Sequence, residues 1–159
     1  MYNIGDKIVH PMHGAGIVDE IKEDRINGVT RTYYIMRLPY GGMTVMIPTE
    51  TAESIGVRDI ITAEQAEKLL EAMAEIQVEM TSNWNKRYRE NMLKIKSGDL
   101  LEVAGVIKGL MARDAEKGLS TGERKMLHSA KQILVSELVL VQGKEYDDVE
   151  KTVDSILGK

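Results

Sequence analysis

The sequence contains no cysteine and no phenylalanine, and one tryptophan among its 159 residues. Without cysteine the chain can form no disulfide bond, no thiolate metal site and no cysteine nucleophile, which fits a reducing cytoplasm. A core built without phenylalanine depends on Ile, Leu, Val and the ten methionines. No apolar run approaches the ~18 residues of a membrane span, and the polar N-terminus does not have the shape of a signal peptide. We therefore expect a soluble globular protein with no membrane partner.

The first 56 residues show the pattern of short strands joined by tight turns. Asn27-Gly28 favours a type I′ hairpin, because both central positions of that turn need φ > 0. Gly41-Gly42 indicates a second turn, and Gly14-Ala15-Gly16 a third. About four or five strands in so short a segment predict a small, strongly bent antiparallel sheet or barrel.

From residue 58 onward the apolar residues recur at helical spacing, and capping residues divide the segment into helices. Three predicted N-caps have a capping partner three residues later: Thr62 with Gln65, Asp99 with Glu102, and Ser120 with Glu123. A further helix is capped by Ser82 or Asn83. Glycines at positions 98, 118 and 143 then end successive helices. We predict an α+β protein, with a β domain over residues 1–56 and an all-α helical bundle over residues 57–159.

Positive charge is concentrated in one part of the chain. The formal net charge is −4, yet residues 81–117 carry eight basic and five acidic side chains. The densest part begins at Trp84, and its basic residues are Lys86, Arg87, Arg89, Lys94 and Lys96. Such a run is more often a solvated helix face than a nucleic-acid contact. Trp84 lies between polar Asn83 and Asn85, off any clear apolar stripe, so an anchor for the bundle and an exposed wedge are equally supported.

Patterns typical of enzymes and metal sites do not occur in the sequence. His10 and His13 are three residues apart but have no third ligand nearby, and His128 lies in the helical part, so we expect structural or surface histidines. The Gly14–Gly16 segment lacks the third glycine and the following helix of a nucleotide-binding loop. No two carboxylates are singled out as acid and base. We therefore expect no metal, no cofactor, no small-molecule ligand and no enzymatic activity.

Four stretches carry a family resemblance. They are SNWNKRYREN at 82–91 with KIKSGD at 94–99, GDKIVHP at 5–11 with HG at 13–14, GVRD at 56–59, and LSTGERKML at 119–127 with AK at 130–131. These stretches resemble the CarD/CdnL family of bacterial transcription regulators, in order and along essentially the whole chain. The resemblance implies a Tudor-like N-terminal domain, shared with the transcription-repair coupling factor, that binds the RNA polymerase β subunit. It also implies a helical domain that contacts promoter DNA at the upstream edge of the bubble.

The resemblance also implies site residues. Trp84 matches the family's minor-groove wedge, and the expected DNA-binding residues around it are Lys86, Arg87, Arg89, Arg124 and Lys125. Some members contact polymerase through arginines of the N-terminal sheet. Here Met46 stands where such an arginine can occur, and Arg25 stands one position from another. We therefore expect a more apolar polymerase contact, made by Arg25, Ile26 and Met46.

Electrostatics favours a division of labour between the two domains. A protein of net charge −4 with about four or five phosphate contacts binds DNA weakly at cellular salt, because each contact adds only about 0.9 to the salt slope. Tethering to polymerase would make that contact intramolecular, at an effective concentration of up to about millimolar. We favour a polymerase-tethered transcription factor, acting in the bacterial cytoplasm at the nucleoid. The alternatives are a protein-interaction adaptor without nucleic-acid contact and a small hydrolase or metal enzyme.

Overall fold

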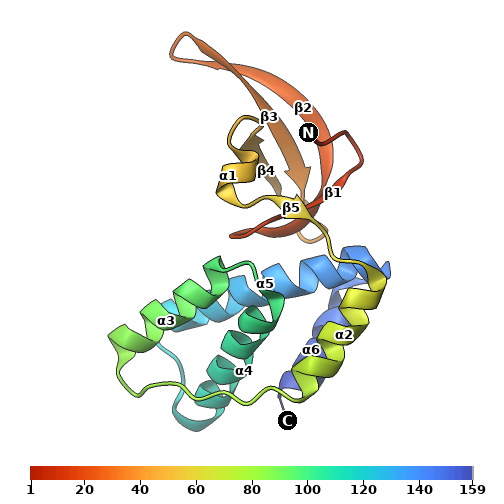
Figure 1. The fold of residues 1–159 in the computed structure, drawn as a ribbon. Helices are drawn as coiled ribbons and strands as arrows, with labels where there is room; N and C mark the ends of the chain where they lie inside the picture. The colour runs from red at the N-terminus through yellow and green to blue at the C-terminus, as the bar shows by residue number, and fades with distance from the viewer. Residues whose placement is uncertain (159) are drawn as a thin grey trace.

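The computed structural model describes residues 1–158, which form a β domain stacked on a helical domain (Figure 1). The elements of the β domain are β1 (Lys7–His10), β2 (Gly14–Ile26), β3 (Val29–Arg37), β4 (Thr44–Pro48), α1 (Ala52–Ile55) and β5 (Arg58–Asp59). The helices of the second domain are α2 (Ala63–Ala74), α3 (Trp84–Lys96), α4 (Leu100–Lys117), α5 (Thr121–Gln142) and α6 (Tyr146–Leu157). This order confirms the predicted α+β class.

The five strands form one antiparallel sheet in the order β4-β3-β2-β1-β5. The predicted hairpin forms at Asn27-Gly28, where the φ angles are 53° and 79° and Ile26 pairs with Val29. Figure 1 shows this long β2–β3 hairpin curving away from the rest of the sheet. Because β5 pairs with β1, the sheet continues beyond residue 56, where we expected the β domain to end.

The glycines at positions 14 and 16 do not form the turn that we predicted. The turn lies at residues 11–13, and both glycines belong to β2. A Cβ at Gly14, whose φ is +94°, would overlap Ser136 Oγ of α5. A Cβ at Gly16 would lie 2.6 Å from the carbonyl oxygen of Arg37 in β3. These glycines are therefore required by the close approach of β2 to two neighbouring elements.

Helices α4 and α5 form the centre of the helical domain, since each of them contacts α2, α3 and α6. The N-caps that form as predicted are Thr62 with its Gln65 capping box, Asn83, and Asp99. At Ser120 only half of the predicted box forms. Ser120 Oγ accepts a hydrogen bond from the Glu123 backbone N–H at 3.2 Å, whereas the Glu123 carboxylate turns toward Arg87 of α3.

Helix α5 also holds the two domains together, and Figure 1 shows it directly beneath the sheet. The buried carboxylate of Glu137 accepts two hydrogen bonds from the Arg58 guanidinium, both of 2.8 Å, and one from the Ile61 backbone N–H at 2.9 Å. One residue earlier, Ser136 Oγ accepts a hydrogen bond from the Ala15 backbone N–H at 2.9 Å. The orientation of the domains is thus set by specific polar contacts at one end of α5.

Candidate nucleic-acid interface

Trp84 is the first residue of α3 and lies at the rim of the helical domain. Its indole stacks on Tyr88, one turn later on the same helix, with ring centroids 5.1 Å apart and an interplanar angle of 19°. The indole Nε1–H donates a hydrogen bond to Ser120 Oγ at 3.0 Å. Even so, 43% of the residue remains exposed. Trp84 is therefore held in a defined orientation without being buried in the core.

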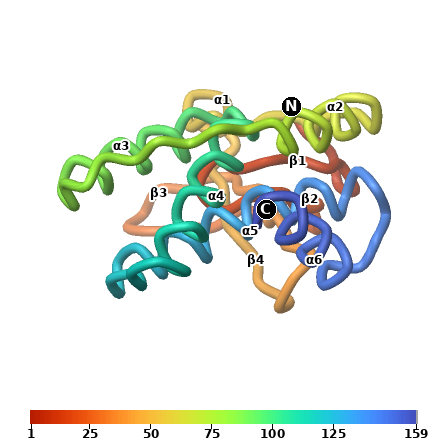
Figure 2. The backbone as a smooth tube through the Cα atoms, turned by 90° about the horizontal axis from the view of Figure 1, so that it is seen from below, coloured from red at the N-terminus to blue at the C-terminus, as the bar shows by residue number. Residues whose placement is uncertain are grey.

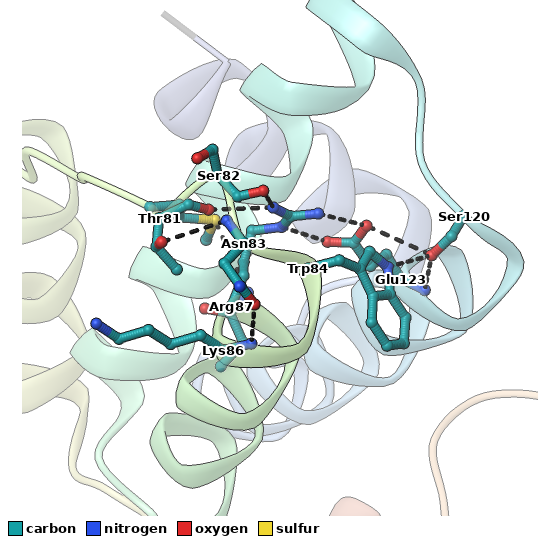
Figure 3. Close-up of polar contacts among 10 residues, drawn as sticks. Thr81, Ser82, Asn83, Trp84, Lys86, Arg87, Ser120 and Glu123 are labelled. Carbon is teal, nitrogen blue, oxygen red and sulfur yellow. Dashed lines mark hydrogen bonds and ion pairs between the residues drawn. The ribbon is translucent and has the colours of Figure 1, made fainter.

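Behind Trp84, a buried ion pair joins α3 to α5. The Arg87 side chain donates from Nε to Glu123 Oε2 at 2.8 Å and from Nη2 to Oε1 at 3.1 Å. Its Nη1 donates to the carbonyl oxygens of Thr81 and Ser82. The hydroxyl of Ser120 donates to Glu123 Oε1 at 3.4 Å, so a chain of polar contacts runs from Arg87 to the indole (Figure 3). The pair fixes the start of α3 against the start of α5.

The pKa values of the pair follow from this geometry. Hydrogen bonds from Arg87 lower the pKa of Glu123 and outweigh burial, which acts in the opposite direction. The hydrogen bond to Glu123 correspondingly raises the pKa of Arg87. Both groups are therefore charged at neutral pH, as a stable bidentate Arg–carboxylate contact requires.

The position of Arg87 corrects one of our predictions. Only 1% of the residue is exposed, and its donors are directed to Glu123, Thr81 and Ser82. A guanidinium enclosed in this way is not available to a DNA phosphate. The burial of Arg87 could have been predicted from the helical spacing. Arg87, Asn91 and Ile95 recur every four positions and therefore share the core-facing side of α3.

The other four predicted basic residues are exposed. Lys86 and Arg89 lie in the first half of α3, and Arg124 and Lys125 lie in the first turns of α5. Because Trp84 bonds to Ser120, the N-cap of α5, the N-termini of α3 and α5 are neighbours. The partial positive charge of a helix N-terminus adds to the side-chain charges at both ends. The structure thus places one exposed aromatic ring and four exposed cations within the first two turns of two neighbouring helices, with the Lys86 side chain directed away from the ring (Figure 3).

On the β domain, the three predicted polymerase contacts do not lie at one point. Arg25 and Ile26 are at the tip of the β2–β3 hairpin, whereas Met46 pairs with Ile35 in β4, an edge strand of the sheet. Strand alternation places Ile26, Met46 and the exposed Val29 on the outer face and Arg25 on the opposite one. Our sequence interpretation missed Val29, which is 53% exposed and directly opposite Ile26.

Within residues 1–158, no three His, Cys, Asp or Glu side chains are grouped so that they could hold a metal ion. In the same part of the chain, none of the helices combines the length and the apolar character that crossing a bilayer demands.

Comparison with known proteins matches two successive parts of the chain. Residues 2–61 match the family model described as "CarD-like/TRCF RID domain", and residues 68–154 match "CarD, C-terminal domain". The chain is also 37% identical, over 143 residues, to "Putative transcription factor YdeB" of Bacillus subtilis (strain 168), a match that covers 90% of this chain and 94% of that protein. This family is one of transcription regulators and not a known class of enzyme. The chain belongs to the CarD family of transcription factors, and its N-terminal RID domain is of the kind that interacts with the RNA polymerase β subunit.

Proposed function

We propose that this protein binds the RNA polymerase β subunit through its β domain and stabilises the promoter open complex by placing Trp84 at the upstream edge of the bubble. The observation that carries the proposal is the state of Trp84, which is oriented by Tyr88 and Ser120 yet remains 43% exposed. An aromatic ring held in this way is available to stack on a base or to insert at the minor groove. The bacterial cytoplasm, at the nucleoid, is the corresponding location.

The wedge acts on DNA that polymerase has already opened. Inserting a side chain between stacked base pairs costs on the order of a few kcal/mol per step. At the edge of the bubble, stacking is already broken on one side, so most of that cost is absent. Because the indole is pre-oriented, little further conformational entropy is lost when it stacks. Trp84 therefore slows the closing of the bubble more than it promotes melting of intact duplex.

The exposed cations of α3 and α5 contact phosphates. Lys86, Arg89, Arg124 and Lys125 lie in the first two turns of the two helices, and helix N-termini bind phosphate groups well. Phosphate contacts position a protein on DNA without reading its sequence. The buried Arg87 acts as a positioning residue, because it holds α3 and the Trp84 ring against α5.

The β domain supplies the tether. Its outer face presents the exposed apolar residues Ile26, Val29 and Met46. The outer edge of β4 pairs with no other strand of residues 1–158. The sheet therefore offers a partner both an apolar face and a free edge. The link to the DNA side is a single helix, since α5 carries Glu137 at the domain interface and Glu123 beside Trp84. Fourteen residues at 1.5 Å per residue separate the two by about 21 Å. Docking of the β domain thus determines where Trp84 is placed.

The decisive experiment measures the lifetime of the promoter open complex after a competitor is added, with the full chain and with Trp84→Ala. We expect Trp84→Ala to lose most of the lifetime extension, because base–aromatic stacking contributes about 1–3 kcal/mol per base. Co-purification with polymerase is the control and should be unchanged. Equal lifetimes for both proteins would contradict the wedge.

The adaptor alternative is tested separately. The fluorescence of the only tryptophan should change when forked promoter DNA is added to the full chain, since stacking on a base changes its environment. Unchanged fluorescence together with intact polymerase binding would favour an adaptor that does not contact nucleic acid.

A further inference from the structure

An open cavity of about 330 Å³ lies on the side of α4 that faces the segment before α3. Figures 1 and 2 both show this segment, which connects α2 to α3, crossing α4. Val78 and Met80 of the segment pack directly on Gly109 of α4, where a Cβ would lie 2.8 Å from Met80 Sδ and 3.0 Å from Val78 Cγ1. One wall of the cavity is α4 and the other is the segment before α3, and the absence of a side chain at Gly109 allows the two to pack closely.

The cavity wall carries an excess of positive charge. Lys108, Arg113 and Lys117 of α4 line it, against one carboxylate, that of Glu116. Among the ion pairs formed within residues 1–158, none includes any of these three cations. Three cations that share one wall and have no carboxylate partner create a local positive potential that attracts an anion.

Arg113 adds a second, independent observation. Its Nε is buried and has no hydrogen-bond partner within the described residues. Its charge also reaches the Arg87–Glu123 pair, because Arg113 is among the groups that lower the pKa of Glu123. Arg113 is thus near enough to Glu123 to influence its pKa without forming an ion pair with it, and its Nε donor is unused. A buried donor without a protein partner is uncommon, so Arg113 is the cation of this wall whose hydrogen-bonding capacity the described residues leave unsatisfied.

The cavity adjoins the proposed DNA-binding surface. Ser82 lines it and lies two residues before Trp84, and the Ser82 carbonyl oxygen accepts a hydrogen bond from Arg87 Nη1 at 3.2 Å. Figure 3 shows Ser82 and Trp84 on opposite sides of the Arg87 guanidinium. An anion in the cavity would therefore lie just beyond the buried pair that supports the wedge.

We propose that the cavity bounded by Lys108, Arg113, Lys117 and Ser82 binds a phosphate group. The inference rests on the proposed function, because it extends the contact of Trp84 with promoter DNA along one strand. A phosphate oxygen accepts hydrogen bonds from guanidinium and ammonium groups, and the Ser82 hydroxyl is a further donor. Since the cavity is open to solvent, a phosphate that remains part of a DNA strand can enter it.

The test uses the full chain and the double variant Lys108→Gln/Lys117→Gln, with Lys151→Gln, an exposed lysine of α6, as the matched control. In the first arm, melting temperatures are compared in sodium pyrophosphate and in sodium chloride of equal ionic strength. Pyrophosphate should raise the melting temperature of the natural chain and the control but not of the double variant. In the second arm, binding to forked DNA is measured against salt concentration. The double variant should have a slope lower by about one unit for each phosphate that it no longer binds.

The two arms distinguish the source of the phosphate and separate this inference from the proposed function. Loss of pyrophosphate stabilisation together with a lower salt slope supports a DNA phosphate in the cavity. Loss of stabilisation with an unchanged slope supports the phosphate site and assigns it to a free phosphate compound. If the double variant behaves like Lys151→Gln in both arms, the inference is wrong, while the wedge test on Trp84→Ala stands by itself.

Discussion

Two Arg–Glu pairs lie along α5, and they have different roles at its two ends. Glu123 at the start of the helix pairs with Arg87, and Glu137 in its second half pairs with Arg58. In each pair the carboxylate is buried and accepts two hydrogen bonds from the arginine. The arginines differ, because 1% of the Arg87 side chain is exposed, against 34% of the Arg58 side chain.

That difference in exposure separates two roles. A fully enclosed pair cannot lose one member without leaving an uncompensated buried charge, so Arg87–Glu123 is a condition for the local fold beneath Trp84. When Glu137 is changed, Arg58 can still reach water, so the interdomain pair governs orientation more than folding. Identical chemistry thus secures a local structure in one place and a domain arrangement in the other.

The largest effect is expected from breaking the enclosed pair. Glu123→Ala should lower the free energy of unfolding by about 3–5 kcal/mol, because the Arg87 charge remains buried without a partner. Denaturant unfolding provides the measurement. Glu90→Ala, which removes a more exposed carboxylate 4.0 Å from Lys86 on α3, is the control and should change the free energy by about 0–1 kcal/mol. Similar losses in both variants would contradict the assigned role of burial.

Acid should also weaken this pair, with a smaller loss in the free energy of unfolding. The pKa of Glu123 is lowered in the folded protein from its ordinary value of 4.5, so its contribution to stability is fully present above that value. As the pH falls through the lower, folded-state pKa, the carboxylate takes up a proton and the contribution is lost. Unfolding curves recorded below pH 4.5 should therefore show a decline that Glu123→Gln lacks. A decline of equal size in that variant would assign the acid sensitivity to other carboxylates.

The interdomain pair is tested by Glu137→Gln, which keeps the size of the side chain and removes its charge. We expect the free energy of unfolding to fall by about 1–3 kcal/mol, since charge-assisted hydrogen bonds are replaced by weaker ones. The informative readout is the distance distribution between spin labels placed on the two domains, which should broaden. The open-complex lifetime should shorten while co-purification with polymerase is retained. An unchanged distance distribution would show that other contacts fix the orientation.

The smallest effect on stability is expected at Trp84 itself. Core tryptophans cost roughly 3–5 kcal/mol when truncated to alanine. Trp84 is partly exposed and stacks on a side chain at the rim, so Trp84→Ala should cost about 1 kcal/mol or less, in the range of a single aromatic contact. Thermal melting measures this directly. A drop in the melting temperature as large as that of Glu123→Ala would mean that Trp84 is an anchor of the bundle.

Features that depend on a few neighbouring residues could be predicted from the sequence. The hairpin at Asn27-Gly28, the capping box at Thr62 and the helix end at Gly98 all formed as expected. In each case the relevant φ angle or capping hydrogen bond involves residues within four positions of one another. Local sterics and local hydrogen bonds decide such features before the domain is assembled.

Features that depend on distant residues could not be predicted in this way. The Gly14-Ala15-Gly16 segment is typical of a turn. Glycine is instead required at position 14 because Ser136, 122 positions away in the chain, packs closely against it. Arg87 belongs to an exposed-looking basic run, yet its partner Glu123 is 36 positions away. Glu123 itself matches a capping box and instead gives its carboxylate to the other helix.

The sequence by itself determined the α+β class, the order of strands before helices, most of the helix caps and the family resemblance that points to RNA polymerase. Only the tertiary structure decided which of the basic side chains face solvent, how Trp84 is held, and which three cations line one cavity. The physical reason is that the exposure and pairing of a side chain depend on what packs against it. Such neighbours are brought together by the fold and not by their order in the chain.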